Sequence, residues 1–87
     1  MRLRPGVTMT QADDAAVLLD ERNGRYRQLN ATAVLVLRSL LAGDSPAEAA
    51  RELTRAHPGA APTAEADVEA LLALLRAADL IDETRHP

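Results

Sequence analysis

The chain has 87 residues, 47% of them hydrophobic, which is enough for one small domain and too little for two. It contains no cysteine, so a disulfide scaffold, a cysteine-ligated zinc site and a thiol nucleophile are excluded. Thirteen acidic and ten basic residues give a formal charge of −3, which disfavours non-specific binding to nucleic acid or anionic lipid.

The first third of the sequence has the pattern of antiparallel strands. Residues 7–11 contain Val and Thr and precede a turn at 12–14, and residues 15–21 surround a continuous apolar centre. Asn23-Gly24 supplies the residue types preferred at the positive-φ positions of a tight hairpin. Residues 25–29 then form the returning strand, so we expect a three-stranded meander.

Helical spacing replaces the strand pattern after the meander. Asn30 is a good N-cap for a first helix over residues 31–41. Ser45 begins a second helix, with Pro46 at its first position and Glu48 completing a capping box. The sequence therefore predicts two consecutive helices with a short connection.

A third helix follows a predicted loop. The second helix is broken at His57-Pro58-Gly59, and residues 59–62 have loop composition. Thr63 is the expected N-cap of a helix over about 64–78, after which Leu80-Ile81 is a short apolar return. The predicted fold class is α+β and winged-helix-like, with a three-stranded antiparallel sheet followed by three helices.

The sequence predicts a cytoplasmic protein. No apolar run approaches the ~20 residues of a membrane helix, and no signal peptide is recognisable at the N-terminus. We expect one domain over residues 1–87, with an ordered core at about 7–82 and a polar tail at 83–87.

Catalysis and cofactor binding find little support in the sequence. Ser39 lies inside the first predicted helix, and Ser45 is used as a cap. His57 and His86 have no ligand-spaced partner, whereas a catalytic site needs nucleophile, base and orienting group to converge. No glycine-rich phosphate loop is present. We therefore expect no enzymatic activity, no metal and no cofactor.

The third predicted helix has a wider apolar arc than a one-sided surface helix requires. One part of this arc, around Leu72, can face the core, and the other part would then line a groove. An alternative is that neighbouring elements bury this helix more fully. Asp67 would then be present because an acidic side chain is favourable near a helix N-terminus. The groove-facing part contains Asp67, Leu71, Leu74 and Ala78.

The last strand of the meander would be a sheet edge with unpaired main-chain groups. An extended peptide can add to such an edge as a further strand, and an adjoining groove takes its side chains. Arg25 and Arg27 suit an acidic ligand strand, and Tyr26 offers a large amphipathic surface. Alternating arginines also protect an edge from aggregation, which is the non-binding alternative. The candidate edge residues are Arg25, Tyr26, Arg27, Gln28 and Leu29.

Several segments carry a resemblance to a known family. The hairpin Val17-Leu18-Leu19-Asp20 leads to the Gly-x-Tyr-x-x-Leu-Asn junction at residues 24–30, which runs into Ala31-Thr32-Ala33. Over about residues 7–82, the chain resembles the PqqD-like RiPP recognition elements, specifically the stand-alone leader-peptide-binding proteins of lasso peptide pathways. The later matching positions are Leu37, Leu40-Leu41-Ala42-Gly43, Asp67-Val68, Leu71-Leu72, Leu75 and Leu80-Ile81.

The resemblance implies a non-catalytic protein that binds the leader of a ribosomally made precursor peptide. The leader would add as a strand against residues 25–29, in the cleft beside the third helix, whose wall would be Asp67, Leu71, Leu74 and Ala78. The implied partners are a transglutaminase-like cysteine leader peptidase and, later in maturation, an asparagine-synthetase-like cyclase.

Two other functions remain open at this point. The first is a winged-helix DNA-binding module. Its DNA-reading helix should be basic, whereas the third predicted helix begins with Glu65, Asp67 and Glu69. We therefore expect neither nucleic acid nor membrane as a partner. The second is an oligomerisation domain, in which the edge strand and groove would bind a second copy of the chain.

Overall fold

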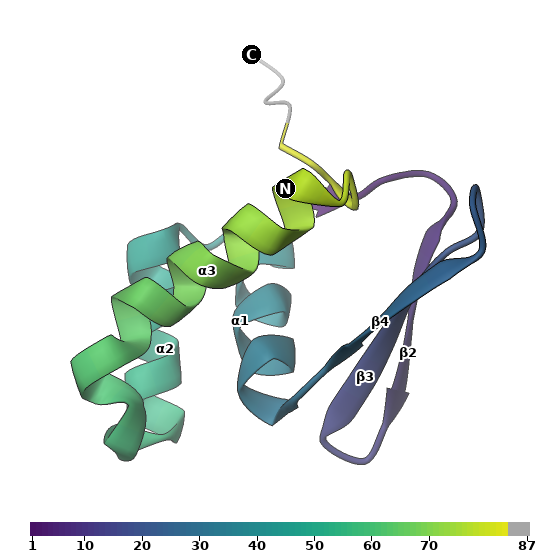
Figure 1. The fold of residues 1–87 in the computed structure, drawn as a ribbon. Coiled ribbons are helices and arrows are strands. Elements are labelled where there is room, and N and C mark those ends of the chain that lie inside the picture. Colours follow the sequence, from purple (N-terminus) through teal and green to yellow (C-terminus); the bar gives the residue numbers. More distant parts are fainter. Residues whose placement is uncertain (84–87) are drawn as a thin grey trace.

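The computed structural model of the chain describes residues 1–83 and has the expected α+β fold. A three-stranded antiparallel sheet lies beside three helices, and a small two-stranded sheet joins the two ends of the described chain (Figure 1). The elements in order are β1 (Arg2–Leu3), β2 (Val7–Ala12), β3 (Ala15–Asp20), β4 (Arg25–Leu29), α1 (Ala31–Leu41), α2 (Pro46–Ala56), the 3-10 helix η1 (Pro58–Thr63), α3 (Ala64–Ala77) and β5 (Ile81–Asp82).

The large sheet has the strand order β2-β3-β4, so β4 is an edge strand with one hydrogen-bonded neighbour in this sheet. Ala16, Leu18 and Asp20 of β3 are buried, whereas Leu19 is exposed. Because successive side chains of a strand point to opposite faces, the buried face is the one that meets the helices. The predicted meander is confirmed.

The β3–β4 connection is longer than the sequence predicted. Asn23-Gly24 lies in the turn, but four residues, 21–24, separate the paired residues Asp20 and Arg25. Within this turn only Gly24 has a positive φ, of 72°, and its N–H donates to the carbonyl oxygen of Asp20 at 2.8 Å. The hairpin is confirmed, and its turn is one residue longer than predicted, because Glu21 lies in the turn and not in β3.

The first two helices begin at the residues that their caps predict. The Asn30 side-chain oxygen accepts a hydrogen bond from the Ala33 N–H at 2.9 Å. Ser45 Oγ accepts from the Glu48 N–H at 3.1 Å, and Glu48 Oε1 accepts from the Ser45 N–H at 2.9 Å. These reciprocal bonds satisfy main-chain donors that would otherwise lack partners at the start of α2.

The connection between α2 and α3 differs from the expectation of a loop. It forms η1, because Pro58 and Pro62 hold φ near the value of a helical turn. The Thr63 hydroxyl does not cap α3; it donates to Asp67 Oδ2 at 3.0 Å. Helix α3 ends one residue earlier than predicted, with Ala78 as its C-cap.

The N-terminal residues form a strand that no sequence signal indicated. Strand β1 pairs antiparallel with β5, placing Arg2 opposite Asp82 and Leu3 opposite Ile81. This pairing fastens the chain that follows α3 to the chain that precedes β2. Of the polar tail predicted at 83–87, residues 84–87 lie outside the described residues.

The hydrophobic core lies between the large sheet and the helices. Val68, Leu72 and Leu75 of α3 are buried in it, as the apolar arc predicted. They meet Leu18 of β3 and Leu37 of α1 in one cluster of buried side chains. No helix within residues 1–83 is long and apolar enough to cross a bilayer.

Candidate functional site

The free side of β4 presents the main-chain groups of Tyr26 and Gln28. The carbonyl oxygen of Asp20 accepts a hydrogen bond from within the hairpin turn, so the main chain of Asp20 faces β4. Main-chain groups alternate in direction along a strand, so Leu18 also faces β4, and its register partner Arg27 faces β3. Tyr26 and Gln28 therefore direct their N–H and C=O groups away from the sheet, where a further strand can reach them.

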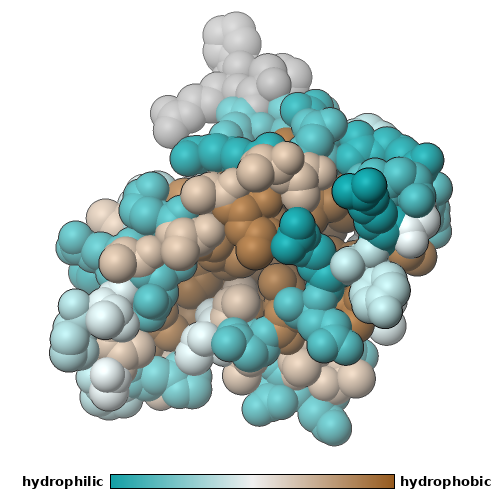
Figure 2. Space-filling model, in the orientation of Figure 1, coloured by the Kyte–Doolittle hydropathy of each residue, from teal (hydrophilic) through white to brown (hydrophobic). Residues whose placement is uncertain are grey.

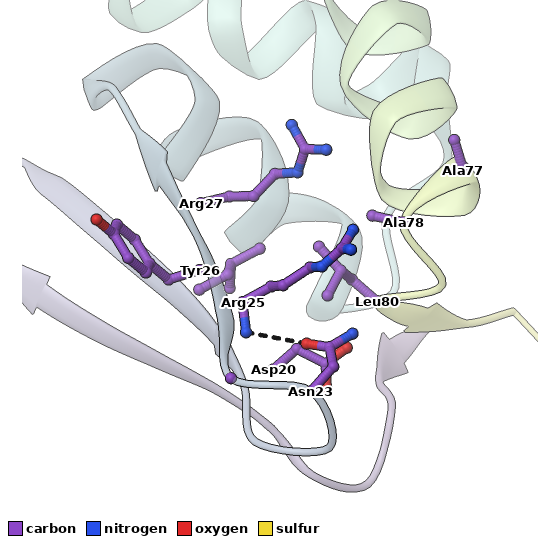
Figure 3. A pocket seen from close by; sticks show the side chains of 10 residues that line it. Asp20, Asn23, Arg25, Tyr26, Arg27, Ala77, Ala78 and Leu80 are labelled. Carbon is purple, nitrogen blue, oxygen red and sulfur yellow. Dashed lines mark hydrogen bonds between the residues drawn. The ribbon is translucent and has the colours of Figure 1, made fainter.

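The side chains of β4 alternate between the two faces of the sheet. Figure 3 shows the Arg25 and Arg27 side chains on the side of α3, and the Tyr26 side chain on the opposite side. Tyr26 is 66% exposed, and Gln28 is exposed as well. Leu29 is buried in the core. Of the five predicted edge residues, two arginines therefore point toward α3, two residues lie on the outer face, and Leu29 belongs to the core.

A cavity of about 590 Å³ lies between β4 and the C-terminal end of α3 (Figure 3). Leu18 and Leu80 supply apolar surface from the core side, and Ala77 and Ala78 supply it from the helix. Figure 2 shows hydrophobic surface continuing into the hollow beside α3. The lining residues are Leu18, Asp20, Asn23, Gly24, Arg25, Tyr26, Arg27, Ala77, Ala78 and Leu80.

The four predicted residues of the third helix have different surroundings. Ala78 lines the cavity and Leu74 is half-buried at the edge of the core. Leu71 is only 8% exposed and belongs to the core cluster. Asp67 is exposed and accepts its hydrogen bond from Thr63, near the N-terminal end of α3. The cavity therefore meets the C-terminal part of the predicted groove wall.

A buried carboxylate supports the hairpin beside the cavity. Asp20 is 3% exposed, and Arg22 bonds to both of its oxygens, Nε to Oδ1 and Nη2 to Oδ2, each at 2.8 Å. Hydrogen bonds from this Arg22 guanidinium hold the pKa of Asp20 below its ordinary value. Arg22 also donates to the carbonyl oxygen of Asp79 at 2.7 Å. The hairpin turn is thereby fixed to the end of α3.

The sequence reasoning did not select several residues that line this cavity, including Asp20 and Asn23. Strand alternation carried a signal for Asp20, because it places this residue on the same face as Leu18. Asn23 Oδ1 accepts a hydrogen bond from the Arg25 N–H at 2.9 Å (Figure 3), a contact set by the length of the turn. No local sequence pattern could have predicted that Leu80 lines the cavity, because its position depends on where α3 ends.

The described residues offer no evident metal site. No group of three or more His, Cys, Asp or Glu side chains within residues 1–83 could hold a metal ion. The site contains a strand edge with unpaired main-chain groups, a partly apolar hollow and two guanidinium groups. This combination suits an extended peptide rather than a reacting small molecule.

Comparison with known families agrees with this geometry. The family model described as "Coenzyme PQQ synthesis protein D (PqqD)" matches residues 15–81. The chain belongs to the PqqD family. The match to PqqD runs from the first residue of β3 to the first residue of β5, so it contains both β4 and α3. The family expected from the sequence is confirmed.

Two solved structures resemble this PqqD-family chain. The first, "Lasso peptide synthetase B1 complexed with the leader peptide", is 43% identical, with a TM-score of 0.81, and the match covers 91% of this chain and 93% of that one. The second, "TbiB1 in Complex with the TbiA(beta) Leader Peptide", is 26% identical, with a TM-score of 0.82 and coverage of 99% and 100%. No curated protein matches the chain.

Proposed function

We propose that this chain binds the leader segment of a ribosomally made, lasso-type precursor peptide as an added strand on β4. The observation that carries the proposal is the outward direction of the Tyr26 and Gln28 main-chain groups beside a partly apolar hollow. Further support comes from the two similar structures, both of which are described as complexes with a leader peptide. The binding residues would be the edge strand Arg25–Leu29 together with Leu74 and Ala78.

Main-chain pairing alone would hold a leader weakly. Each main-chain hydrogen bond contributes about 1 kcal/mol net. The four groups of Tyr26 and Gln28 would thus contribute about 4 kcal/mol, which is no more than association costs in lost translational and rotational freedom. Burying one leucine-sized side chain adds about 1.5–3 kcal/mol. A leader must therefore also fill the hollow between β4 and α3 to bind tightly.

Anisotropy titration with fluorescent synthetic leaders of lasso peptide precursors tests this proposal. We expect saturable binding of at least one leader. Gln28→Pro should weaken that binding about tenfold relative to Gln28→Ala, because only proline removes the outward N–H. A proline with its nitrogen facing solvent is tolerated on an edge strand, so both variants should fold. Binding of no leader, or equal affinities of the two variants, would contradict strand addition at β4.

In this proposal the chain performs no catalysis. The Ser39 hydroxyl donates to Asp44, and Ser45 caps α2, so both hydroxyl groups have structural partners. The bound leader is presented to a transglutaminase-like cysteine leader peptidase, and an asparagine-synthetase-like cyclase acts afterwards. Precursor cleavage by that peptidase should accelerate when this chain is added. An unchanged cleavage rate at saturating chain concentration would contradict presentation.

The DNA-binding alternative receives no support from the surface of α3. Glu65, Asp67 and Glu69 are all exposed along its first two turns, where they would repel phosphate groups. A mobility-shift assay should detect no complex with duplex DNA at low salt. Sedimentation with and without leader tests the oligomer alternative, because a leader that competes for β4 would dissociate a β4-mediated dimer.

A further inference from the structure

Two arginine side chains point into the cavity without an acidic partner. Figure 3 shows Arg25 and Arg27 extending from β4 into the space beside Ala78 and Leu80. Among residues 1–83, neither guanidinium group makes an ion pair or a side-chain hydrogen bond. Two positive charges therefore face the cavity without an ionic partner among these residues.

The natural partner of Arg25 is already occupied. Asp20 lies directly opposite Arg25 in the β3–β4 register, where opposite charges usually pair. However, Arg22 uses both Asp20 oxygens, through its Nε, its Nη2 and its main-chain N–H, the last at 3.0 Å. Arg27 lies opposite the buried Leu18, which offers no charge. The arrangement leaves both cavity-facing guanidinium groups free for a ligand.

We propose that Arg25 and Arg27 form a subsite for a carboxylate side chain, Asp or Glu, of the peptide strand that adds to β4. The inference rests on the proposed function and specifies which leaders the site accepts. In an antiparallel guest strand, the residues opposite Tyr26 and Gln28 make the main-chain bonds. The residue opposite Arg27 is then a non-hydrogen-bonded partner, in which side chains approach most closely. A carboxylate at that position can accept charge-assisted hydrogen bonds from the guanidinium groups.

The subsite predicts a pattern in the guest sequence. Side chains of the guest that face the hollow recur at every second residue. The acidic residue and the apolar residues that fill the hollow must therefore be separated by even numbers of positions. Residues at the intervening positions point toward the outer face, on the side of Tyr26, and need no defined charge.

Selection from a display library of random twelve-residue peptides tests the subsite. The bait proteins are the wild type, the Arg25→Gln/Arg27→Gln variant, and Arg51→Gln/Arg55→Gln, which removes the same charge from α2. Wild-type and α2-variant pools should be enriched in Asp or Glu at a fixed position relative to the apolar residues. The pool of the cavity variant should keep the apolar pattern and lose the acid.

The three possible failures of this selection have different meanings. A wild-type pool with apolar positions but no preferred acid would overturn the subsite and leave strand addition intact. An acid preference that persists in the cavity variant would also overturn the subsite. If no peptide is enriched on any bait, the proposed function itself is contradicted, and the subsite with it.

A charge exchange with one selected peptide gives a second test. Replacing its preferred acid by the corresponding amide should weaken binding to the wild type about tenfold. Arg27→Glu should also weaken binding of that peptide, and a lysine in place of the acid should restore it. Thermal unfolding of Arg27→Glu should match the wild type, since Arg27 has no ionic partner within residues 1–83. Failure of the lysine peptide to recover affinity would contradict direct contact.

Discussion

Arg22 donates a hydrogen bond from Nη2 to the main-chain carbonyl oxygen of Asp79 at 2.7 Å, which joins the β3–β4 turn to the residue that follows the C-cap of α3. The same guanidinium group holds the buried Asp20. Arg4 approaches the Asp79 carboxylate as well, with its Nε 2.8 Å from Oδ1. The two walls of the hollow, β4 and α3, are therefore held at a fixed spacing by ionic contacts at one end.

Breaking this link should weaken both the fold and leader binding. In Arg22→Gln, Asp20 remains buried without its cation, and the turn loses its bond to Asp79. We expect a lower Tm and a several-fold weaker leader affinity. Asp79→Asn is the control, because it retains the main-chain carbonyl that accepts from Arg22, and its losses should be smaller. Equal Tm and affinity in Arg22→Gln and the wild type would disprove the link.

Asp20 should make the stability of the protein sensitive to acid. The hydrogen bonds from Arg22 lower the pKa of Asp20 below its ordinary value of 3.8. A carboxyl group with a lowered pKa in the folded state stabilises the fold above its unfolded pKa, and this stability is lost as the pH falls through the folded pKa. The free energy of unfolding, measured with urea, should therefore fall below about pH 4. Asp20→Asn should flatten that decline, and an equally steep decline would argue against this role.

Leu74 and Leu71 should respond differently to truncation, although the sequence placed both on the groove wall. Leu71 is a core residue, so Leu71→Ala should cost about 2–5 kcal/mol of stability. Leu74 is half-buried, and Leu74→Ala should instead lower leader affinity about tenfold, by removing apolar surface that the leader covers. Urea unfolding and leader titration of both variants separate the roles. A stable Leu74→Ala protein with unchanged affinity would exclude Leu74 from the site.

Loss of the α2 cap should affect stability without affecting recognition. Ser45 and Glu48 exchange two hydrogen bonds at the start of α2, a part of the chain that does not line the cavity. Ser45→Ala should destabilise the protein by about 1 kcal/mol. At a temperature 10 °C below the lowered Tm, its leader affinity should equal that of the wild type at the same temperature. If Ser45→Ala also bound the leader more weakly, loss of affinity would reflect general destabilisation and not a change at the binding site.

Short-range chemistry explains which parts of this structure could be predicted from the sequence. Asn30 and Ser45 act within three residues of themselves, so their helices were predicted with the correct first residue. The pairing of β1 with β5 joins opposite ends of the described chain, and two-residue strands carry no periodic signal. The Asp20–Arg22–Asp79 contacts also depend on tertiary packing, although strand alternation alone puts Asp20 on the same face as Leu18.

The sequence predicts which faces of β4 its side chains occupy, but it does not predict how deeply each residue of α3 is buried. Alternation along residues 25–29 separates Arg25 and Arg27 from Tyr26, and the structure has this separation. A helical arc cannot distinguish the buried Leu71 from the half-buried Leu74, because the two positions are neighbours on one side of the same helix. Which of them is accessible depends on how closely α3 approaches its neighbours.

Main-chain hydrogen exchange of β4, measured residue by residue by NMR, tests strand addition most directly. In the free protein, the amides of Tyr26 and Gln28 should exchange quickly and the amide of Arg27, bonded to β3, should be protected. A saturating leader peptide should slow the exchange of Tyr26 and Gln28 and leave Arg27 protected. Unchanged exchange at Tyr26 and Gln28 in the saturated complex would contradict strand addition to β4.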